Sequence, residues 1–556
     1  MSKLIIKNGL VFDPLNNIEG EKKDILIEGE FIVEKFSNPS DVKEIDAQGK
    51  TVIPGALDIH THIASQQVNW VRLIGTKNSL FKKIWQGLTL EKIARDYINN
   101  GYTFILEANV FPSLSKQTLF DFTHLPVLDK GMLLNVSNFW ALELEFQRGK
   151  IDELSIFLSD LMQKTKAFGL KVYNPFESED WNFKEIRNDL KASGRLYNFS
   201  ALDVYENLAK ANEHMGLPHS IHAHIEGYET EYAKGNYSLI LDKINSLDKV
   251  PQLKEKSKNP RSQIFHLAHA SAYIIEEDNA ELINIINQSN KIDLDIGFLT
   301  FNKINPLITS DRKLIAKELK FENEHNILIR SAVEFEGDSF VKFRNFDKNN
   351  ENHCLMWANG IGLALNIKDK WKVQLSLNYP NYGNINDIAE VATWLLSSDA
   401  RIKFMKDMTR SFKFKEFLSE SNNILSFYEF IILSRASPAK SLGLGNIKGN
   451  LGIGADADIN ILDIDLNNID TAKQYEVIKN SLKDIEYVIK SGEIIKNRDR
   501  LDLSHQGKIL WTKGIIEKDE SSIILKQKKD FYQKYYSFFY DSLATSINSD
   551  YLRLIE

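Results

Sequence analysis

Between residues 54 and 439, short strand-like runs of apolar residues alternate with longer stretches whose apolar residues recur at helical spacing. Eight strand-like runs occur, at residues 56–61, 103–107, 132–136, 170–173, 219–224, 263–268, 291–296 and 373–377. Eight strands that alternate with helices are typical of a (β/α)8 barrel, which buries its strands and carries catalytic residues at their carboxyl ends. We therefore predict an α/β fold whose main domain is a TIM-type barrel over residues 54–439.

Strand-like segments also lie at both ends of the chain, outside the predicted barrel. Three precede it, at residues 4–12 and 24–33 and in a run that ends at Ile53, and two follow it, at residues 457–463 and 486–495. So few strands have too little core to be stable alone and need a partner sheet. We therefore expect residues 1–53 and 440–512 to form one small composite β-sandwich domain beside the barrel.

Two segments do not fit this alternation. Residues 299–350 are long, polar and irregular, so we predict an insertion that covers the barrel mouth. Residues 513–556 form a C-terminal extension, whose aromatic-rich stretch 531–540 predicts a helix. Two alternatives remain open for this extension: it packs on its own domain, or it docks on a partner protein.

The composition narrows the class of protein. With 43% hydrophobic and 26% charged residues, the 556-residue chain is typical of a soluble globular protein. A net charge of -7, with lysines spread along the chain, gives no support for a nucleic-acid partner. We find neither a signal-peptide pattern nor an apolar run long enough to span a membrane, so we expect a cytoplasmic protein. The single cysteine, Cys354, excludes an internal disulfide and a cysteine-based metal cluster.

The most specific motif ends the first predicted barrel strand, where Pro54 and Gly55 precede the segment Asp58-Ile-His-Thr-His62. Residues i and i+2 of a strand share a face, so His60 and His62 can bind one cation from the same side. The pattern Pro-Gly-x-x-Asp-x-His-x-His resembles the first-strand signature of the amidohydrolase superfamily of metal-dependent hydrolases. Other ligands are therefore expected at the ends of other barrel strands.

Three further strands carry candidate ligands. Lys171 lies on the fourth strand, and the fifth places His222 and His224 on one face, with His224 nearer the carboxyl end. The sixth strand ends near His269. Superfamily members with two metals use a lysine on the fourth strand, carboxylated by carbon dioxide, as a bridge between ions ~3.5–4 Å apart. Imidazoles combined with an anionic oxygen bridge suit zinc. We predict a site for two divalent metal ions formed by His60, His62, Lys171, His224 and His269.

Additional motifs make the resemblance more specific. They run in order from about residue 3 to residue 512 and include the segments 171–175, 216–224 and 434–444, together with Asn69 and Arg72 after the first histidine pair. Collinear motifs of this kind are similar to the A subunit of formylmethanofuran dehydrogenase and to its counterpart in the bacterial formyltransferase/hydrolase complex. Dihydroorotases and hydantoinases share mainly the metal signature.

This resemblance implies a formamide hydrolase that interconverts N-formylmethanofuran with formate and methanofuran. It implies a complex with sister subunits, a dinuclear centre bridged by carboxylated Lys171, and methanofuran as the carrier substrate. Asn69 and Arg72 are then candidates for contact with the anionic, glutamate-rich tail of the carrier. Hydrolysis of another cyclic amide, such as a hydantoin, is a third alternative.

The sequence departs from the family at the eighth strand. Asn378 stands where the family pattern Thr-Asp-x-Pro-Asn-Gly-Gly has its catalytic aspartate. An amide carries no charge and cannot serve as a carboxylate base, and the loss of a general base costs ~10²–10⁴-fold in rate. Either Glu226, which continues the alternation of His222 and His224, replaces this base, or the protein has lost hydrolysis and persists as a scaffold or carrier-binding partner in its complex. Glu226 also has a simpler interpretation as an ordinary loop carboxylate. The retention of all five ligand candidates favours hydrolysis.

Overall fold

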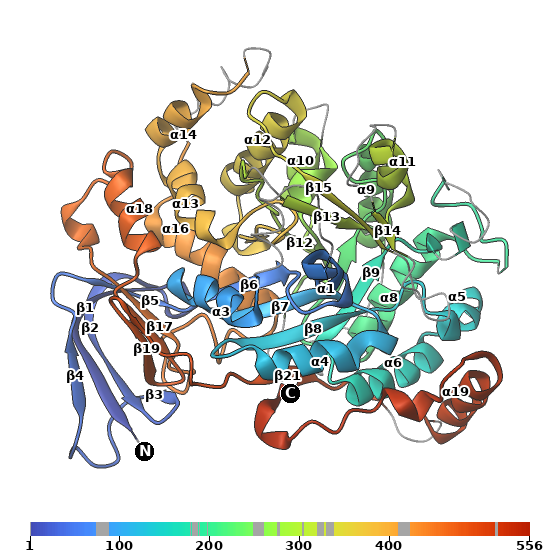
Figure 1. Cartoon of the computed structure of the whole chain (residues 1–556), viewed down its shortest axis with the longest axis horizontal. Helices are drawn as coiled ribbons and strands as arrows, with labels where there is room; N and C mark the ends of the chain where they lie inside the picture. The colour runs from blue at the N-terminus through green and yellow to red at the C-terminus, as the bar shows by residue number, and fades with distance from the viewer. Residues whose placement is uncertain are drawn as a thin grey trace.

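The computed structural model describes the chain except for residues 1, 74–87, 178, 181–186, 188, 197, 248–260, 275–278, 303–304, 320–326, 330–338, 410–422, 517–520 and 556. Its centre is a sheet of parallel strands that curves into a nearly closed barrel (Figure 1). In order around the wall, the strands are β6 (Ala56–Thr61), β7 (Tyr102–Val110), β8 (Asp129–Asn135), β9 (Gly169–Tyr173), β10 (Ile221–His224), β11 (Phe265–Leu267), β12 (Ile292–Asp295) and β16 (Val373–Gln374). Between the first and last strands, the Tyr379 carbonyl oxygen accepts a hydrogen bond of 2.7 Å from the His62 amide. The predicted eight-stranded barrel is confirmed.

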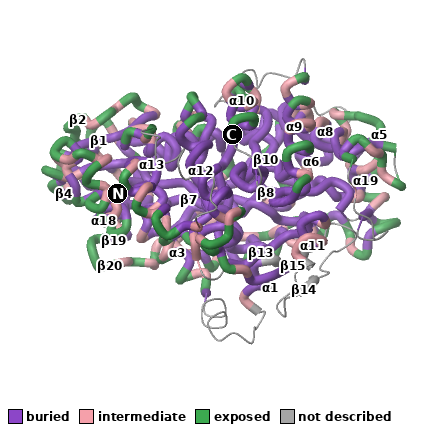
Figure 2. The backbone as a smooth tube through the Cα atoms, turned by 90° about the horizontal axis from the view of Figure 1, so that it is seen from above, coloured by how far each residue is buried: buried purple, intermediate pink, exposed green. Residues whose placement is uncertain are grey.

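Helices between the strands cover the outside of the barrel. The main ones are α3 (Leu90–Asn99), α4 (Ser115–His124), α6 (Ile151–Thr165), α8 (Ala201–His214), α9 (Ala233–Asn245), α10 (Ala280–Gln288), α12 (Glu351–Asn366) and α13 (Ile388–Leu396). Ser200 and Asp203 form a reciprocal capping box that fixes the start of α8. Figure 2 shows that burial is continuous through the centre of the molecule, where the barrel strands lie. Among the described helices, none combines the length and the apolar character that crossing a bilayer requires.

The two ends of the chain share a second, nine-stranded sheet, which is seen beside the barrel in Figure 1. Its strands are β1 (Lys3–Asp13), β2 (Ile18–Glu28), β3 (Phe31–Val33), β4 (Lys43–Asp46), β5 (Thr51–Pro54), β17 (Ile459–Leu462), β18 (Tyr487–Lys490), β19 (Glu493–Asn497) and β20 (Arg500–Leu501). The two chain ends meet where β5 pairs antiparallel with β17. Gly55 then leads directly from β5 into β6, at a point where a Cβ atom would collide with Thr103. The predicted composite β domain is confirmed.

The C-terminal part of the chain returns to the barrel. Strand β21 (Ile509–Thr512), which the sequence analysis assigned to the small domain, pairs parallel with the start of β8 and with β22 (Leu552–Ile555). The first half of the aromatic stretch 531–540 lies in α19 (Ser521–Tyr535), which packs against α6, whereas residues 536–539 have no helical structure, contrary to the prediction. Tyr532 packs 6.1 Å from Phe139, measured between ring centroids. The described part of the extension therefore packs on its own barrel.

The segment predicted as an irregular insertion contains regular structure. Strands β13 (Asn305–Thr309), β14 (Ile327–Ile329) and β15 (Ser339–Arg344) form a small antiparallel sheet, with α11 (Arg312–Leu319) after the first strand. Apolar residues that alternate along β13 and β15, such as Leu307 and Phe343, are buried and stabilise this sheet. The Ile308 amide donates a 3.3 Å hydrogen bond to the side-chain oxygen of Asn381, which follows the last barrel strand. This contact holds β13 beside the segment that follows the last barrel strand.

Candidate metal centre

The five predicted metal ligands line one small cavity at the carboxyl ends of the barrel strands. This cavity, of ≈ 20 Å³, is lined by His60, His62, Asn109, Lys171, Tyr173, His224, Tyr228, His269, Ile308, Asn378 and Asn381. The ligand candidates come from β6, β9, β10 and the turn after β11, which meet because parallel strands of a barrel end on the same rim. Asn378, which the sequence pattern aligns with a catalytic aspartate, lines the same cavity.

Two carboxylates orient the histidines of the first strand. The Nδ1 atom of His60 lies 3.2 Å from Asp295 Oδ2, and the Nδ1 atom of His62 lies 3.2 Å from Glu107 Oε1. A carboxylate that accepts the Nδ1 proton leaves the lone pair on Nε2, which is the arrangement that supports histidine ligation of metals. His60 Nε2 is buried and has no hydrogen-bond partner among the described residues. Such an atom is suited to a metal ion.

The other two histidines show the same property. His224 Nδ1 lies 2.7 Å from His269 Nε2, so one ring donates a hydrogen bond to the other. Their remaining nitrogens, His224 Nε2 and His269 Nδ1, are buried without a partner in the described part of the chain. Burial lowers the pKa of His269 to about 3 and the pKa of His224 well below its usual value, so both rings are neutral at pH 7. The ring that donates this hydrogen bond has its lone pair on the outer nitrogen and can bind a divalent metal ion as it stands. The ring that accepts carries its proton on the outer nitrogen and must lose this hydrogen bond before that nitrogen can bind a metal ion.

Lys171 also fits the predicted centre. Its side chain is buried, and burial lowers the pKa of its amine to about 7. It has no ion pair within the described part of the chain, and the aromatic ring of Tyr173 lies 5.7 Å from its nitrogen. A buried lysine with a lowered pKa exposes a neutral, nucleophilic amine, which is the form that adds carbon dioxide.

Asn378 adopts a backbone conformation that aspartate also tolerates. Its φ angle of 43° lies in the left-handed region, which asparagine and aspartate enter more readily than most residues. Its side-chain oxygen accepts a 3.3 Å hydrogen bond from the side-chain amide of Asn381. An aspartate at this position could therefore keep both the backbone and the contact.

Glu226 does not reach the metal cavity. It lines a separate cavity of ≈ 20 Å³ with Asp180 and Asp311, and its Oε2 accepts a 3.2 Å hydrogen bond from Lys313. Burial raises the pKa of Glu226 to about 7, while the charge of Lys313 opposes the shift. The structure thus brings Asn378 to the ligands and leaves Glu226 outside, paired with a lysine of the insertion.

Asn69 and Arg72 lie on α1 (Gln66–Leu73), which follows the first histidine pair. Arg72 donates hydrogen bonds to the Asn69 side chain and to the Ile63 carbonyl oxygen, and Asn69 donates one of 3.1 Å to Asp121. Neither residue lines the metal cavity. In this structure they brace the turn after β6, and contact with a carrier tail stays a prediction.

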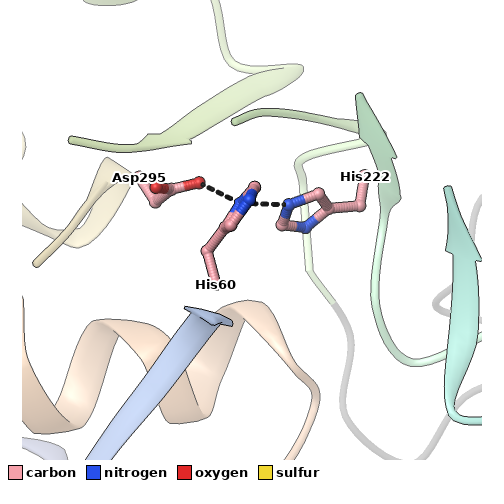
Figure 3. Close-up of side chains that lie close together, drawn as sticks. All are labelled: His60, His222 and Asp295. Carbon is pink, nitrogen blue, oxygen red and sulfur yellow. Dashed lines mark hydrogen bonds and ion pairs between the residues drawn. The ribbon is translucent and has the colours of Figure 1, made fainter. Parts of the chain in front are cut away.

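Further buried residues support the candidate ligands, a role that the sequence did not predict for them. Figure 3 shows His60 between Asp295 and His222, whose Nε2 lies 2.9 Å from His60 Nδ1. Each of His60, His222 and Asp295 offers one atom that could bind a cation, and these three atoms lie within 4.8 Å of one another. Asp295 also contacts His266, and Asp293 contacts the other nitrogen of that ring, at 3.1 and 3.0 Å. Burial would lower the pKa of His266, but these two aspartates raise it to about 9. The alternation Asp293-x-Asp295 at a strand end was the available signal.

A second group of carboxylates has the geometry of a metal site but is already paired with two lysine side chains. Asp129, Asp456 and Asp458 are buried together, and the Lys448 ammonium lies 2.6, 2.8 and 2.8 Å from them. Lys490 contacts Asp129 and Asp458 at 2.9 and 3.0 Å. These ion pairs join the barrel to the small domain, because Asp129 begins β8 and Lys490 ends β18.

A buried ion pair fastens the insertion over the cavity. Arg344 of β15 makes two hydrogen bonds, of 2.7 and 3.0 Å, to Glu229 in the loop after β10, and Tyr382 donates a third of 2.6 Å. Ile308 of the same small sheet covers the metal cavity, whose ≈ 20 Å³ holds little more than a water molecule. The small sheet therefore contributes to the wall of this cavity.

We expect Arg344→Ala to loosen the insertion by about 3–5 kcal/mol, because it leaves the Glu229 carboxylate buried without its cation. Hydrogen exchange of the β13 amides should become faster, while exchange of the barrel strands is unchanged. Lys403→Ala is the matched control, since it breaks an exposed pair with Glu476 and such pairs contribute ~0–1 kcal/mol. Equal exchange of β13 in both variants would contradict the fastening role.

The same ion pair predicts an effect of acid. Burial would raise the pKa of Glu229, but Arg344 lowers it from 4.5 to about 2. A carboxyl group with a lowered folded-state pKa stabilises the fold above its unfolded pKa and loses this contribution as the pH falls through the folded value. Exchange of the β13 amides, corrected for intrinsic rate, should therefore accelerate between about pH 4.5 and pH 2 in the wild type and much less in Arg344→Ala.

Comparisons with known proteins agree with this geometry. Residues 130–496 match the model of the amidohydrolase family. Protein FwdA of Methanocaldococcus jannaschii is 28% identical over 557 residues, which cover 96% of this chain and 95% of that protein. The A subunit of the formyltransferase/hydrolase complex Fhc of Methylorubrum extorquens is 24% identical over 519 residues, which cover 88% of this chain and 89% of that protein.

A solved structure shows the same fold. In the crystal structure of the FhcABCD complex from Methylorubrum extorquens, determined with methylofuran, one chain aligns with a TM-score of 0.84 at 21% identity. The alignment covers 100% of this chain and 99% of that one. The family match spans about two thirds of the sequence and includes Lys171, His224, His269 and Asn378. The chain belongs to the amidohydrolase family.

Proposed function

We propose that this chain is the A-type component of a formylmethanofuran-processing complex, in which it interconverts N-formylmethanofuran with formate and methanofuran. The near full-length similarity to FwdA and to the A subunit of Fhc supports this substrate and an assembly with sister subunits. The observation that carries the proposal is the convergence of His60, His62, Lys171, His224 and His269 on one cavity, with three buried imidazole nitrogens left unpartnered among the described residues.

In this proposal the five residues would hold two divalent ions, with zinc as the first candidate, and carboxylated Lys171 would supply an anionic ligand to them. When bound, such a pair lowers the pKa of a shared water molecule and polarises a carbonyl oxygen. Asp295 and Glu107 keep His60 and His62 in the orientation in which Nε2 faces the cavity. Ile308 and the small sheet above exclude bulk water once the formamide is bound.

One residue weakens the hydrolytic step. In the family, the residue at position 378 is an aspartate that takes the proton of the attacking water and passes it to the leaving amine. The Asn378 side chain can accept a hydrogen bond from this water but cannot take its proton. This observation favours a second function, in which the protein binds its partners and the carrier without efficient turnover. The two functions share the fold and the metal cavity, and they differ in the fate of the formyl group.

The test is to measure metal content and formate release with the purified full chain, alone and with its sister subunits. A hydrolase should contain about two metal ions per chain and release formate from formylmethanofuran until a chelator removes the metal. Metal without turnover would support the carrier-binding function. Turnover of dihydroorotate or a hydantoin, with none of formylmethanofuran, would instead support the third alternative, a cyclic-amide hydrolase.

A further inference from the structure

We infer that His219 and His222 are positioning residues that fix which nitrogen of His60 faces the metal cavity. This inference rests on the proposed metal centre and deepens it. Neither residue is among the five predicted ligands, yet both are buried next to them. Their rings connect His60 to a backbone carbonyl of the chain segment 434–444, a motif for which the proposed reaction has no direct use.

The connection is a series of hydrogen bonds between rings. His219 Nδ1 lies 2.9 Å from the Ser441 carbonyl oxygen, and His219 Nε2 lies 3.2 Å from His222 Nδ1. His222 Nε2 in turn lies 2.9 Å from His60 Nδ1. All four groups are buried, so water does not compete for these contacts. Ser441 ends α17 (Ser437–Ser441), and its hydroxyl group is itself held by Asp293 at 2.7 Å.

The direction of every bond follows from the first one. A carbonyl oxygen only accepts, so His219 Nδ1 must carry the proton that it donates to Ser441. A neutral imidazole has one donor and one acceptor, so His219 Nε2 accepts from His222 Nδ1. By the same rule His222 Nε2 accepts, and the proton between His222 and His60 belongs to His60 Nδ1. His60 Nε2 is left with its lone pair, and this is the buried atom that has no partner among the described residues.

Asp295 gives an independent reason for the same assignment. Its Oδ2 atom, 3.2 Å from His60 Nδ1, also accepts a proton from that nitrogen. Two acceptors, one ionic and one neutral, therefore hold the same N–H group, and they approach it from different strands, β12 and β10 (Figure 3). The ring of His60 is thereby fixed in both rotation and tautomer before any metal binds.

The test is a titration of the metal-free full chain with cobalt(II), followed through the visible absorption of the bound ion. Since outer partners of a metal-binding histidine typically contribute 10–100-fold to affinity, we expect His222→Leu to weaken binding of one of the two cobalt ions by about 10–100-fold. His222→Gln can still accept the His60 proton through its amide oxygen, so it should retain most of the affinity. His353→Leu, which removes a partly buried histidine of α12 outside the cavity, is the control.

Thermal unfolding of the metal-free variants separates this role from simple packing. A lower melting temperature of His222→Leu with unchanged cobalt binding would overturn the inference while the proposed metal centre stands. Equal losses of cobalt affinity in His222→Leu and His222→Gln would also overturn it, because hydrogen-bond acceptance would then be irrelevant. A wild-type chain that binds no cobalt would remove both the inference and the metal centre on which it rests.

Discussion

Asn378→Asp is expected to increase formate release by about 10²–10⁴-fold, the usual contribution of a general base. The five ligand residues and position 378 line the same cavity, so the new carboxylate would face the place where the attacking water must lie. The left-handed backbone of residue 378 accepts aspartate, and the hydrogen bond from Asn381 can be kept. Steady-state kinetics should show the change in kcat, since the group acts in the chemical step.

Asn381→Asp provides the matched control for this experiment. It adds the same charge to the same cavity three residues further along, where the side-chain oxygen already accepts a hydrogen bond from the Ile308 amide. A comparable gain in both variants would mean that added negative charge, and not a positioned base, is responsible. If Asn378→Asp has no effect and Glu226→Gln abolishes turnover, the base is Glu226 and the lysine pairing seen here must change on substrate binding.

Lys171→Met is expected to abolish turnover and to lower affinity for both metal ions by more than about 100-fold. Removing a residue that only hydrogen-bonds to a ligand already lowers metal affinity by about 10–100-fold. One bridging ligand serves two ions, so its loss affects both. Metal content measured by elemental analysis should fall from about two per chain to a small fraction, and added bicarbonate should increase metal binding in the wild type only.

Lys130→Met is the matched control, because Lys130 is also buried and burial lowers its pKa to about 7 as well. Its ammonium group donates to the carbonyl oxygens of Leu125 and Gly507, away from the metal cavity. This variant should lose stability but keep its metal. Equal metal loss in both variants would show that the effect of Lys171→Met comes from unfolding and not from a lost ligand.

The sequence predicted those parts of the structure that depend on local patterns. Alternation along a strand identified His60 with His62 and His222 with His224, because side chains two residues apart share a face. The position of a ligand at a strand end then follows from the barrel. Asp295 and Glu107 were missed because their role depends on which strands are neighbours and on their register, which no local pattern specifies.

Other errors have similar physical causes. Strand β21 was assigned to the small domain by its position in the chain, whereas its pairing with β8 joins segments hundreds of residues apart. The ladder between β13 and β15 was hidden by the long polar stretch that separates them. Glu226 continues the alternation of β10 in the sequence, but the strand ends at His224, so the face that the alternation predicted is not maintained.

The composite sheet has a consequence for the order in which this protein can be made. Strand β5, which leads into the histidine pair, has its partner β17 some 400 residues later, and β21 must wait for β22 at the extreme C-terminus. Domains of most proteins fold during synthesis as each is completed, but here the first ligands emerge from the ribosome long before the strands that support them. The edge of β5 that β17 covers in the folded protein therefore stays unpaired until β17 has been synthesised.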